Sequence, residues 1–168
     1  AAKIQTPHLD RLASQGMTFT DGHSSSGICT PSRFALLTGQ HHWRRFHGIV
    51  GAFGGTVFEP EDFTIAKMFK KKGYLTGCFG KWHLGAHRDH GPKKQGFDEF
   101  FGIRNGFIDN FNHHFLHQTG YHDLYEGTTP VKADGKFFPE LMTHRALRFI
   151  EESKDKPFFL YVPFNIPH

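Results

Sequence analysis

A continuous apolar segment near the end of the chain, 158–164, constrains the fold more than any other part of the sequence. Its length is typical of a strand, and apolar residues at consecutive positions indicate burial on both faces of a sheet. The preceding residues, 139–153, predict a helix from four apolar positions with helical spacing: Met142, Ala146, Phe149 and Ile150. A helix followed by a buried strand is the repeating unit of parallel sheets.

The same order occurs earlier in the chain. Residues 63–72 predict a helix with three buried apolar residues, and 74–79 follow as a strand; the three are Ile65, Met68 and Phe69. Nearer the start, Thr6 and Pro7 are typical helix-starting residues for 6–13, and 17–20 alternates as a short strand does. This alternation favours an α/β layered fold with a largely parallel central sheet flanked by helices.

Residues 86–139 interrupt the alternation, because no helix or strand periodicity persists there. Most of the excess of phenylalanine and histidine falls between Phe97 and Phe138. A disordered segment would be poor in aromatic residues. We therefore expect a long, ordered insertion that shapes a site.

Composition excludes several classes of protein. The net charge of +4 is modest and the basic residues are dispersed, which argues against nucleic-acid binding. No run of eighteen apolar residues occurs, so no membrane span is predicted. Two cysteines, Cys29 and Cys78, do not form a disulfide framework, and Cys78 lies within an apolar strand as a core residue would.

The pentapeptide from Cys29 to Arg33, Cys-Thr-Pro-Ser-Arg, immediately precedes and enters a helical pattern over 31–38. The N-terminus of a helix favours anions, and Arg33 adds a fixed cation, so the segment predicts an anion site. The alternative is a buried structural cysteine followed by a surface arginine. A thiol phosphatase fits poorly, because its arginine would occupy the position of Ala35.

This pentapeptide, followed by Leu-Thr-Gly at 37–39, resembles the first signature of the type I sulfatases. Residues 73–85, which include Gly-Lys-Trp-His-Leu-Gly, resemble the second signature, and the flanking segments 6–13, 96–100 and 157–168 also resemble the family. The resemblance implies an alkaline-phosphatase-like fold. It also implies that residues 1–168 are an internal fragment, a partial N-terminal catalytic domain of a sulfatase.

The resemblance assigns a role to five residues. Cys29 would be oxidised to formylglycine (3-oxoalanine), the nucleophile and a metal ligand, and Arg33 would hold it. Lys81 and His83 would contact both formylglycine and sulfate, and His168 would protonate the leaving alcohol. Sulfate ester cleavage builds negative charge on oxygen, so cations and a positioned acid at Cys29 would lower the barrier.

Further components follow from the same resemblance. Asn105 is a weak substitute for a serine that contacts substrate in the family. The cation, commonly Ca²⁺, needs several oxygen ligands that would lie outside this chain, so the chain alone is expected to be inactive. The implied partners are a sulfated small molecule or carbohydrate and a formylglycine-generating enzyme, and a periplasmic or secreted location is expected.

Two other functions stay open. A phosphonate monoester or phosphodiester hydrolase of the same superfamily would use a similarly modified cysteine. A noncatalytic, histidine-rich module that binds carbohydrate or metal would leave Cys29 unmodified and bind zinc. No zinc motif organises the loop histidines, which favours a role near an anionic ligand; they are His41, His42, His87, His90, His113, His114 and His117.

Overall fold

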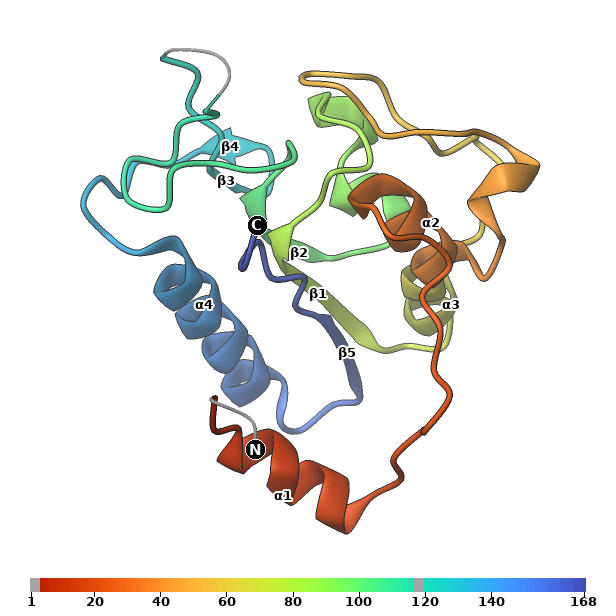
Figure 1. Cartoon of the computed structure of the whole chain (residues 1–168). Coiled ribbons are helices and arrows are strands. Elements are labelled where there is room, and N and C mark those ends of the chain that lie inside the picture. The colour runs from red at the N-terminus through yellow and green to blue at the C-terminus, as the bar shows by residue number, and fades with distance from the viewer. Residues whose placement is uncertain (1–3, 117–119) are drawn as a thin grey trace.

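The computed structural model describes residues 4–116 and 120–168, which form one five-stranded sheet with helices on both faces (Figure 1). The helices are α1 (Pro7–Gln15), α2 (Cys29–Thr38), α3 (Ile65–Lys71) and α4 (Phe138–Ser153). The strands are β1 (Leu75–Lys81), β2 (Glu99–Ile103), β3 (Tyr125–Glu126), β4 (Thr129–Pro130) and β5 (Phe158–Tyr161). Three short 3-10 turns occur at His42–Arg44, Arg88–His90 and Pro92–Gln95.

The strand order is β4-β3-β2-β1-β5. The strand β1 pairs in parallel with β2 and β5, whereas β3 and β4 add an antiparallel hairpin to the β2 edge. Because parallel strands end at the same edge, the carboxyl ends of β1, β2 and β5 lie together. The predicted α/β fold with a largely parallel sheet is confirmed.

Alternating residues of β1 and β2 divide the core between two faces of the sheet. Cys78 and Phe100 pack with α2 and α3, while Phe79 and Phe101 pack with α4. In Figure 1, α4 lies on one side of the sheet and α2 with α3 on the other. Cys78 is fully buried, and burial raises the pKa of its thiol well above the usual range, as the predicted core role requires.

The predicted strand at 158–164 is shorter and less buried than its sequence indicated. Regular strand structure ends at Tyr161, and all four residues of β5 are only half-buried. The reason is its place at an edge of the described sheet, where β1 is its one strand neighbour. The expectation of burial on both faces was wrong.

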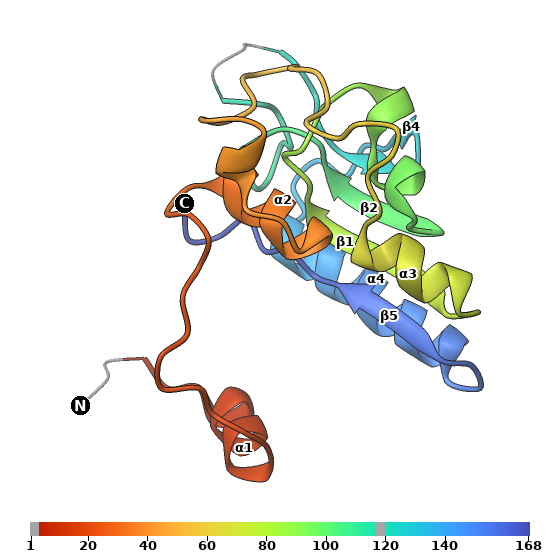
Figure 2. The same cartoon turned by 90° about the vertical axis from the view of Figure 1, so that its right-hand side faces the viewer.

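The N-terminal segment differs more from expectation. The helix α1 begins at Pro7, as predicted, but none of its residues is buried, and it lies away from the sheet (Figure 2). The strand predicted at 17–20 does not form, because no described strand pairs with this exposed segment. Local β propensity cannot form a strand without a partner.

Helix positions were predicted well and helix faces less well. In α3 the buried residue is Ala66, whereas Met68 is 40% exposed, contrary to prediction. In α4 the expected Met142, Ala146 and Phe149 are buried, whereas Ile150 is 38% exposed. None of the helices in the described residues has the length and apolarity needed to cross a bilayer.

Residues 86–139 contain β2, β3 and β4, which the sequence analysis did not predict. The strand β2 is central, yet its sequence, Glu-Phe-Phe-Gly-Ile, is short and lacks polar–apolar alternation. A short apolar run is ambiguous without its neighbours. The site-shaping role of this range stays a prediction.

Phe149 tests the core between α4 and the sheet. Its ring lies 5.5 Å from that of Phe79 and 5.9 Å from that of Phe158, measured between centroids. Replacing Phe149 with alanine removes these contacts and leaves a cavity, so the free energy of unfolding should fall by about 3–5 kcal/mol. Denaturant unfolding followed by circular dichroism measures this change.

The matched control is Leu147→Ala on the same helix, because Leu147 is 62% exposed. That change should alter the free energy of unfolding by at most about 0.5 kcal/mol. Equal effects of the two substitutions would contradict the packing of α4 on the sheet.

Candidate active site

Cys29 is the first helical residue of α2. The preceding residue, Ile28, is extended, and Cys29 itself is partly exposed. The first amide groups of a helix lack intrahelical acceptors and carry partial positive charge. The side chain of Cys29 therefore lies where an anion is stabilised, as the pentapeptide predicted.

Lys81, the last residue of β1, reaches this cysteine. Its Nζ donates a hydrogen bond to Sγ of Cys29 over 3.1 Å, and the lysine is only 1% exposed. Burial lowers the pKa of Lys81, and the hydrogen bond to Cys29 opposes that shift. A buried ammonium group needs an anionic or strongly polar partner, so this pair marks the site as one built for negative charge.

Gly80 allows β1 to approach the segment after β5 closely, just before Lys81. Its φ of 141° is unfavourable for other residues, and a Cβ there would lie 2.3 Å from the carbonyl oxygen of Pro163. The same oxygen accepts a hydrogen bond from the backbone N–H of Lys81 over 2.8 Å. This contact fixes the backbone from which the Lys81 side chain extends.

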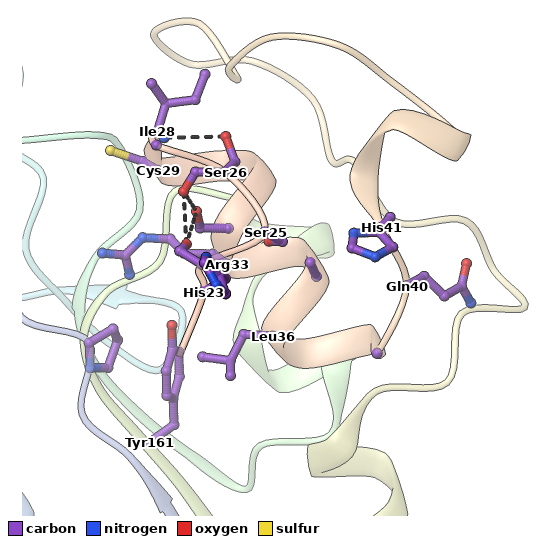
Figure 3. Close-up of a pocket in the computed structure, with 16 residues that line it drawn as sticks. His23, Ser25, Ser26, Ile28, Cys29, Arg33, Leu36, Gln40, His41 and Tyr161 are labelled. Carbon is purple, nitrogen blue, oxygen red and sulfur yellow. Dashed lines mark hydrogen bonds between the residues drawn. The ribbon is translucent and has the colours of Figure 1, made fainter. Parts of the chain in front are cut away.

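Arg33 lies one turn after Cys29 on α2 and links the helix to the sheet. Its guanidinium donates to the backbone carbonyl of Lys81, and more weakly over 3.4 Å to that of Phe164. Figure 3 shows the Cys29 and Arg33 side chains projecting from the same side of α2. Arg33 thus supplies a fixed positive charge beside the cysteine.

His83 is buried two residues after β1. Its Nε2 lies 3.0 Å from the carbonyl oxygen of Val50, which can only accept, so Nε2 carries the proton and Nδ1 a lone pair. Thr30 of α2 donates to the carbonyl of His83 and accepts from the N–H of Val50. This network ties the start of α2 to the end of β1.

The charge state of His83 follows from its surroundings. The pKa of His83 is lowered to about 4, mainly by burial; the hydrogen bond to the Val50 carbonyl opposes this shift, and the positive charges of Lys81, Arg33 and His168 add to it. The backbone of His83 has a φ of 53°, which is uncommon for a residue with a side chain. His83 is therefore a neutral imidazole at pH 7.

His168 follows β5 and is exposed. Its ring stacks on that of Phe107 with centroids 5.2 Å apart. Partial burial lowers its pKa, and the charges of Lys81 and Arg33 act in the same direction. His168 thus belongs to the same electrostatic environment as Cys29 while remaining accessible from outside.

A cavity of about 600 Å³ adjoins Cys29 (Figure 3). Cys29 and Arg33 line it together with the serine-rich loop 23–28 and Tyr161 of β5. Lys81, His83 and His168 are not among its lining residues. Cys29 therefore both lines the cavity and contacts the buried lysine.

Asn105 is 2% exposed and does not reach this cavity. The side-chain oxygen Oδ1 of Asn105 accepts a hydrogen bond from the backbone N–H of Phe53, and the backbone N–H of Asn105 donates to the carboxylate of Asp123. Burial raises the pKa of Asp123 to about 6. The side chain of Asn105 positions a loop, and the structure does not bring it to Cys29.

Three residues that hold the site together were not identified from the sequence: Thr30, Val50 and Asp123. Of these, Thr30 lies within the pentapeptide.

The described residues do not form a calcium site around Cys29. Across 4–116 and 120–168, the one grouping of three or more His, Cys, Asp or Glu side chains near enough to share an ion is His113, His122 and Asp134. It excludes Cys29. Calcium requires about six to eight oxygen ligands. His117, one of the loop histidines considered above, lies outside the described residues.

Solved structures with similar folds are sulfatases, which confirms the predicted alkaline-phosphatase-like fold. The structure of Ps i-CgsB matches 97% of this chain and 40% of its own, with a TM-score of 0.84 and 31% sequence identity. BT4656, solved in complex with D-glucosamine-2-N,6-O-disulfate, matches 98% of this chain and 30% of its own, with a TM-score of 0.72 and 28% identity.

Curated sequences give the same result. An arylsulfatase of Hemicentrotus pulcherrimus is 36% identical over 95% of this chain and 32% of its own length. The N-acetylgalactosamine-6-sulfatase of Mus musculus is 32% identical over 98% of this chain and 35% of its own. The chain therefore spans about a third of the length of these relatives. The family model described as Sulfatase matches residues 2–168, and the chain belongs to the sulfatase family.

Proposed function

We propose that the protein containing this chain hydrolyses sulfate monoesters at Cys29. The observation that carries the proposal is the 3.1 Å contact between Lys81 Nζ and Sγ of Cys29, at a helix N-terminus and beside a cavity. A sulfate ester is anionic, and further negative charge develops on its oxygens as the S–O bond breaks. Fixed donors and cations that are already in place lower that barrier.

Cys29 fits the proposed conversion to formylglycine. It is partly exposed, so a formylglycine-generating enzyme has access to it, and its sulfur occupies the place that an aldehyde oxygen would take. The hydrated aldehyde would supply one hydroxyl to attack sulfur and a second through which sulfate is later expelled. Lys81 would donate its hydrogen bond to that oxygen instead of to sulfur.

His168 is the proposed proton donor to the leaving alcohol. It is exposed, whereas His83 is buried with its Nε2 proton held by Val50. Lys81 and Arg33 lower the pKa of His168, but the negative charge of a bound sulfate offsets them. Substrate binding would therefore favour the protonated, acidic form of His168.

A sulfated carbohydrate is the proposed substrate, and a divalent cation, Ca²⁺, the proposed cofactor. Support for the substrate is the complex of BT4656 with a disulfated glucosamine. Cys29 is the one residue of this chain to which we assign a contact with the cation. The phosphonate or phosphodiester alternative predicts faster turnover of phosphorus esters than of sulfate esters, so parallel assays separate the two.

Replacing the proposed nucleophile provides the first functional test. In full-length protein coexpressed with a formylglycine-generating enzyme, Cys29→Ser should abolish turnover of an aryl sulfate, because serine lacks the second hydroxyl. The free energy of unfolding should change by at most about 1 kcal/mol. Mass spectrometry should find formylglycine at position 29 in the unsubstituted protein.

Cys78→Ala is the control, since it removes the other thiol, which is fully buried in the core and does not line the cavity. It should retain turnover. Near-normal multiple turnover by folded Cys29→Ser protein would show that the nucleophile lies elsewhere. Unmodified Cys29 in active protein would exclude the formylglycine mechanism.

The positively charged side chains of Arg33 and Lys81 should affect kcat more than KM. Arg33→Ala and Lys81→Met each remove a charge that opposes the developing negative charge, so kcat should fall by about a hundredfold or more. Steady-state kinetics with a chromogenic aryl sulfate measures this. Arg44→Ala, an exposed arginine beside Trp43, should leave kcat unchanged. A rise in KM alone would mean that the cations only bind the substrate.

His83 predicts a loss of stability in acid. Its pKa is 6.5 in the unfolded chain and about 4 when folded, so the unfolded state takes up the proton first as pH falls. The contribution of neutral His83 to the free energy of unfolding is therefore constant above pH 6.5. It is lost between pH 6.5 and 4, and the loss is at most about 3 kcal/mol.

His83→Gln keeps a donor for Val50 but cannot become charged. Urea unfolding at several pH values should show a shallower loss of stability in this variant between pH 6.5 and 4 than in the unsubstituted protein. The exposed His144→Gln serves as the control and should keep the original slope. Identical slopes for all three proteins would refute the burial of a neutral His83.

A further inference from the structure

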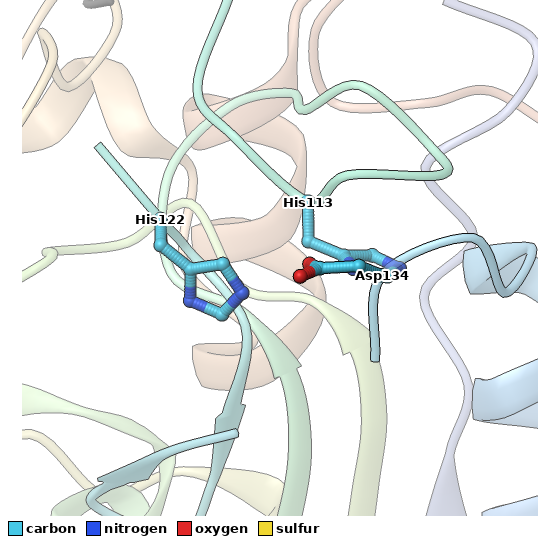
Figure 4. Close-up of side chains that lie close together, drawn as sticks. All are labelled: His113, His122 and Asp134. Carbon is cyan, nitrogen blue, oxygen red and sulfur yellow. The ribbon is translucent and has the colours of Figure 1, made fainter. Parts of the chain in front are cut away.

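Three potential metal ligands converge on the two loops that flank the β3–β4 hairpin (Figure 4). His113 and His122 belong to the connection between β2 and β3, and Asp134 to that between β4 and α4. One ligand atom of each lies within 4.8 Å of the others. Two neighbouring loops thus bring two imidazoles and a carboxylate together.

His113 presents a lone pair toward this cluster. The residue is 0% exposed, and its Nε2 lies 3.0 Å from the carbonyl oxygen of Lys136. Because a carbonyl can only accept, Nε2 carries the ring proton and Nδ1 the lone pair. Nδ1 is buried and has no hydrogen-bond partner among the described residues. Metal-bound histidines commonly donate their second N–H to a carbonyl in this way.

His122 contributes a second buried nitrogen. Its Nε2 also lacks a partner in the described part of the chain, and its ring lies 6.3 Å from that of His113, edge to face. Burial lowers the pKa of both rings, which favours their neutral, metal-binding forms. Unpaired buried polar atoms cost about 1–3 kcal/mol each, a cost that a bound ligand removes.

We propose that Nδ1 of His113, Nε2 of His122 and the carboxylate of Asp134 bind a divalent transition-metal ion of the zinc class. Two imidazoles and one carboxylate suit Zn²⁺, whereas Ca²⁺ requires an oxygen-only set. Water completes a four-coordinate site. The site is separate from Cys29 and from the cation proposed there, and it does not depend on the sulfatase activity.

The ligands need only a small adjustment to close around the ion. Zinc–nitrogen bonds of about 2.0 Å place tetrahedral ligand atoms about 3.3 Å apart. Asp134 is exposed, so its carboxylate can change rotamer without disturbing the core. The ion would then join two loops, one of which carries Phe107, the residue that stacks on His168. The bound ion would therefore have a structural role and would stabilise this edge of the active site.

Zinc titration of the full chain tests the site directly. Protein stripped with a chelator is titrated with ZnCl₂ by calorimetry in a Cys29→Ser background, which removes the exposed thiol as a competing ligand. We expect one equivalent to bind and the Tm to rise, because the ion binds only the folded state. An excess of CaCl₂ should not displace zinc from this cluster, because Ca²⁺ prefers oxygen ligands.

Two variants locate the bound ion. His122→Asn and Asp134→Asn should each weaken zinc binding by more than about a hundredfold, since loss of second-shell partners alone costs about 10–100-fold. His113 is left intact because its burial makes substitution a risk to folding. His144→Asn and Asp155→Asn remove exposed residues of the same types from outside the cluster and should leave the affinity unchanged.

Cobalt substitution supplies a spectroscopic signature. Intense visible absorption by Co²⁺, lost in His122→Asn, would support four-coordinate binding at this cluster. Absence of zinc binding, or binding that survives both His122→Asn and Asp134→Asn, would overturn the proposal. Neither result depends on turnover of a sulfate ester, so failure here leaves the proposed activity untouched.

Discussion

The hydrogen bond from buried Lys81 to Cys29 is the interaction on which the rest of the site depends. A lysine in this position loses most of its hydration, and only a polar or anionic partner offsets that cost. The backbone of Lys81 is held from both sides: its N–H donates to Pro163, and its carbonyl accepts from Arg33. One residue thereby joins α2 to the carboxyl ends of β1 and β5.

This arrangement concentrates positive charge before any substrate arrives. Lys81, Arg33 and the helix N-terminus surround one partly exposed side chain, and the nearby imidazoles are pushed toward their neutral forms. Such mutual repulsion costs stability in the free protein. A bound anion would relieve this repulsion, so under the proposed function the same electrostatic cost would become binding energy for a sulfate ester and for the negative charge that builds up on its oxygens in the transition state.

The cluster of His113, His122 and Asp134 extends this organisation to the loops. The connection after β2 bends back through Asn105 and Phe107, whose contacts with Phe53 and His168 bring it to the edge of the site. Phe53 in turn packs against Tyr121, next to His122. An ion at the cluster would therefore stabilise a loop on which the surroundings of His168 depend, without entering the chemistry at Cys29.

The sequence by itself determined the layered α/β fold and the helix at Cys29, because periodicity is a local property. Its resemblance to the sulfatase signatures identified Lys81, His83 and His168 as site candidates. Tertiary structure decided what depends on neighbours. It left 17–20 unpaired, made β5 an edge strand and placed β2 in the centre. It buried Asn105 and brought His122 to Asp134, contacts between segments whose separation along the chain carries no periodic signal.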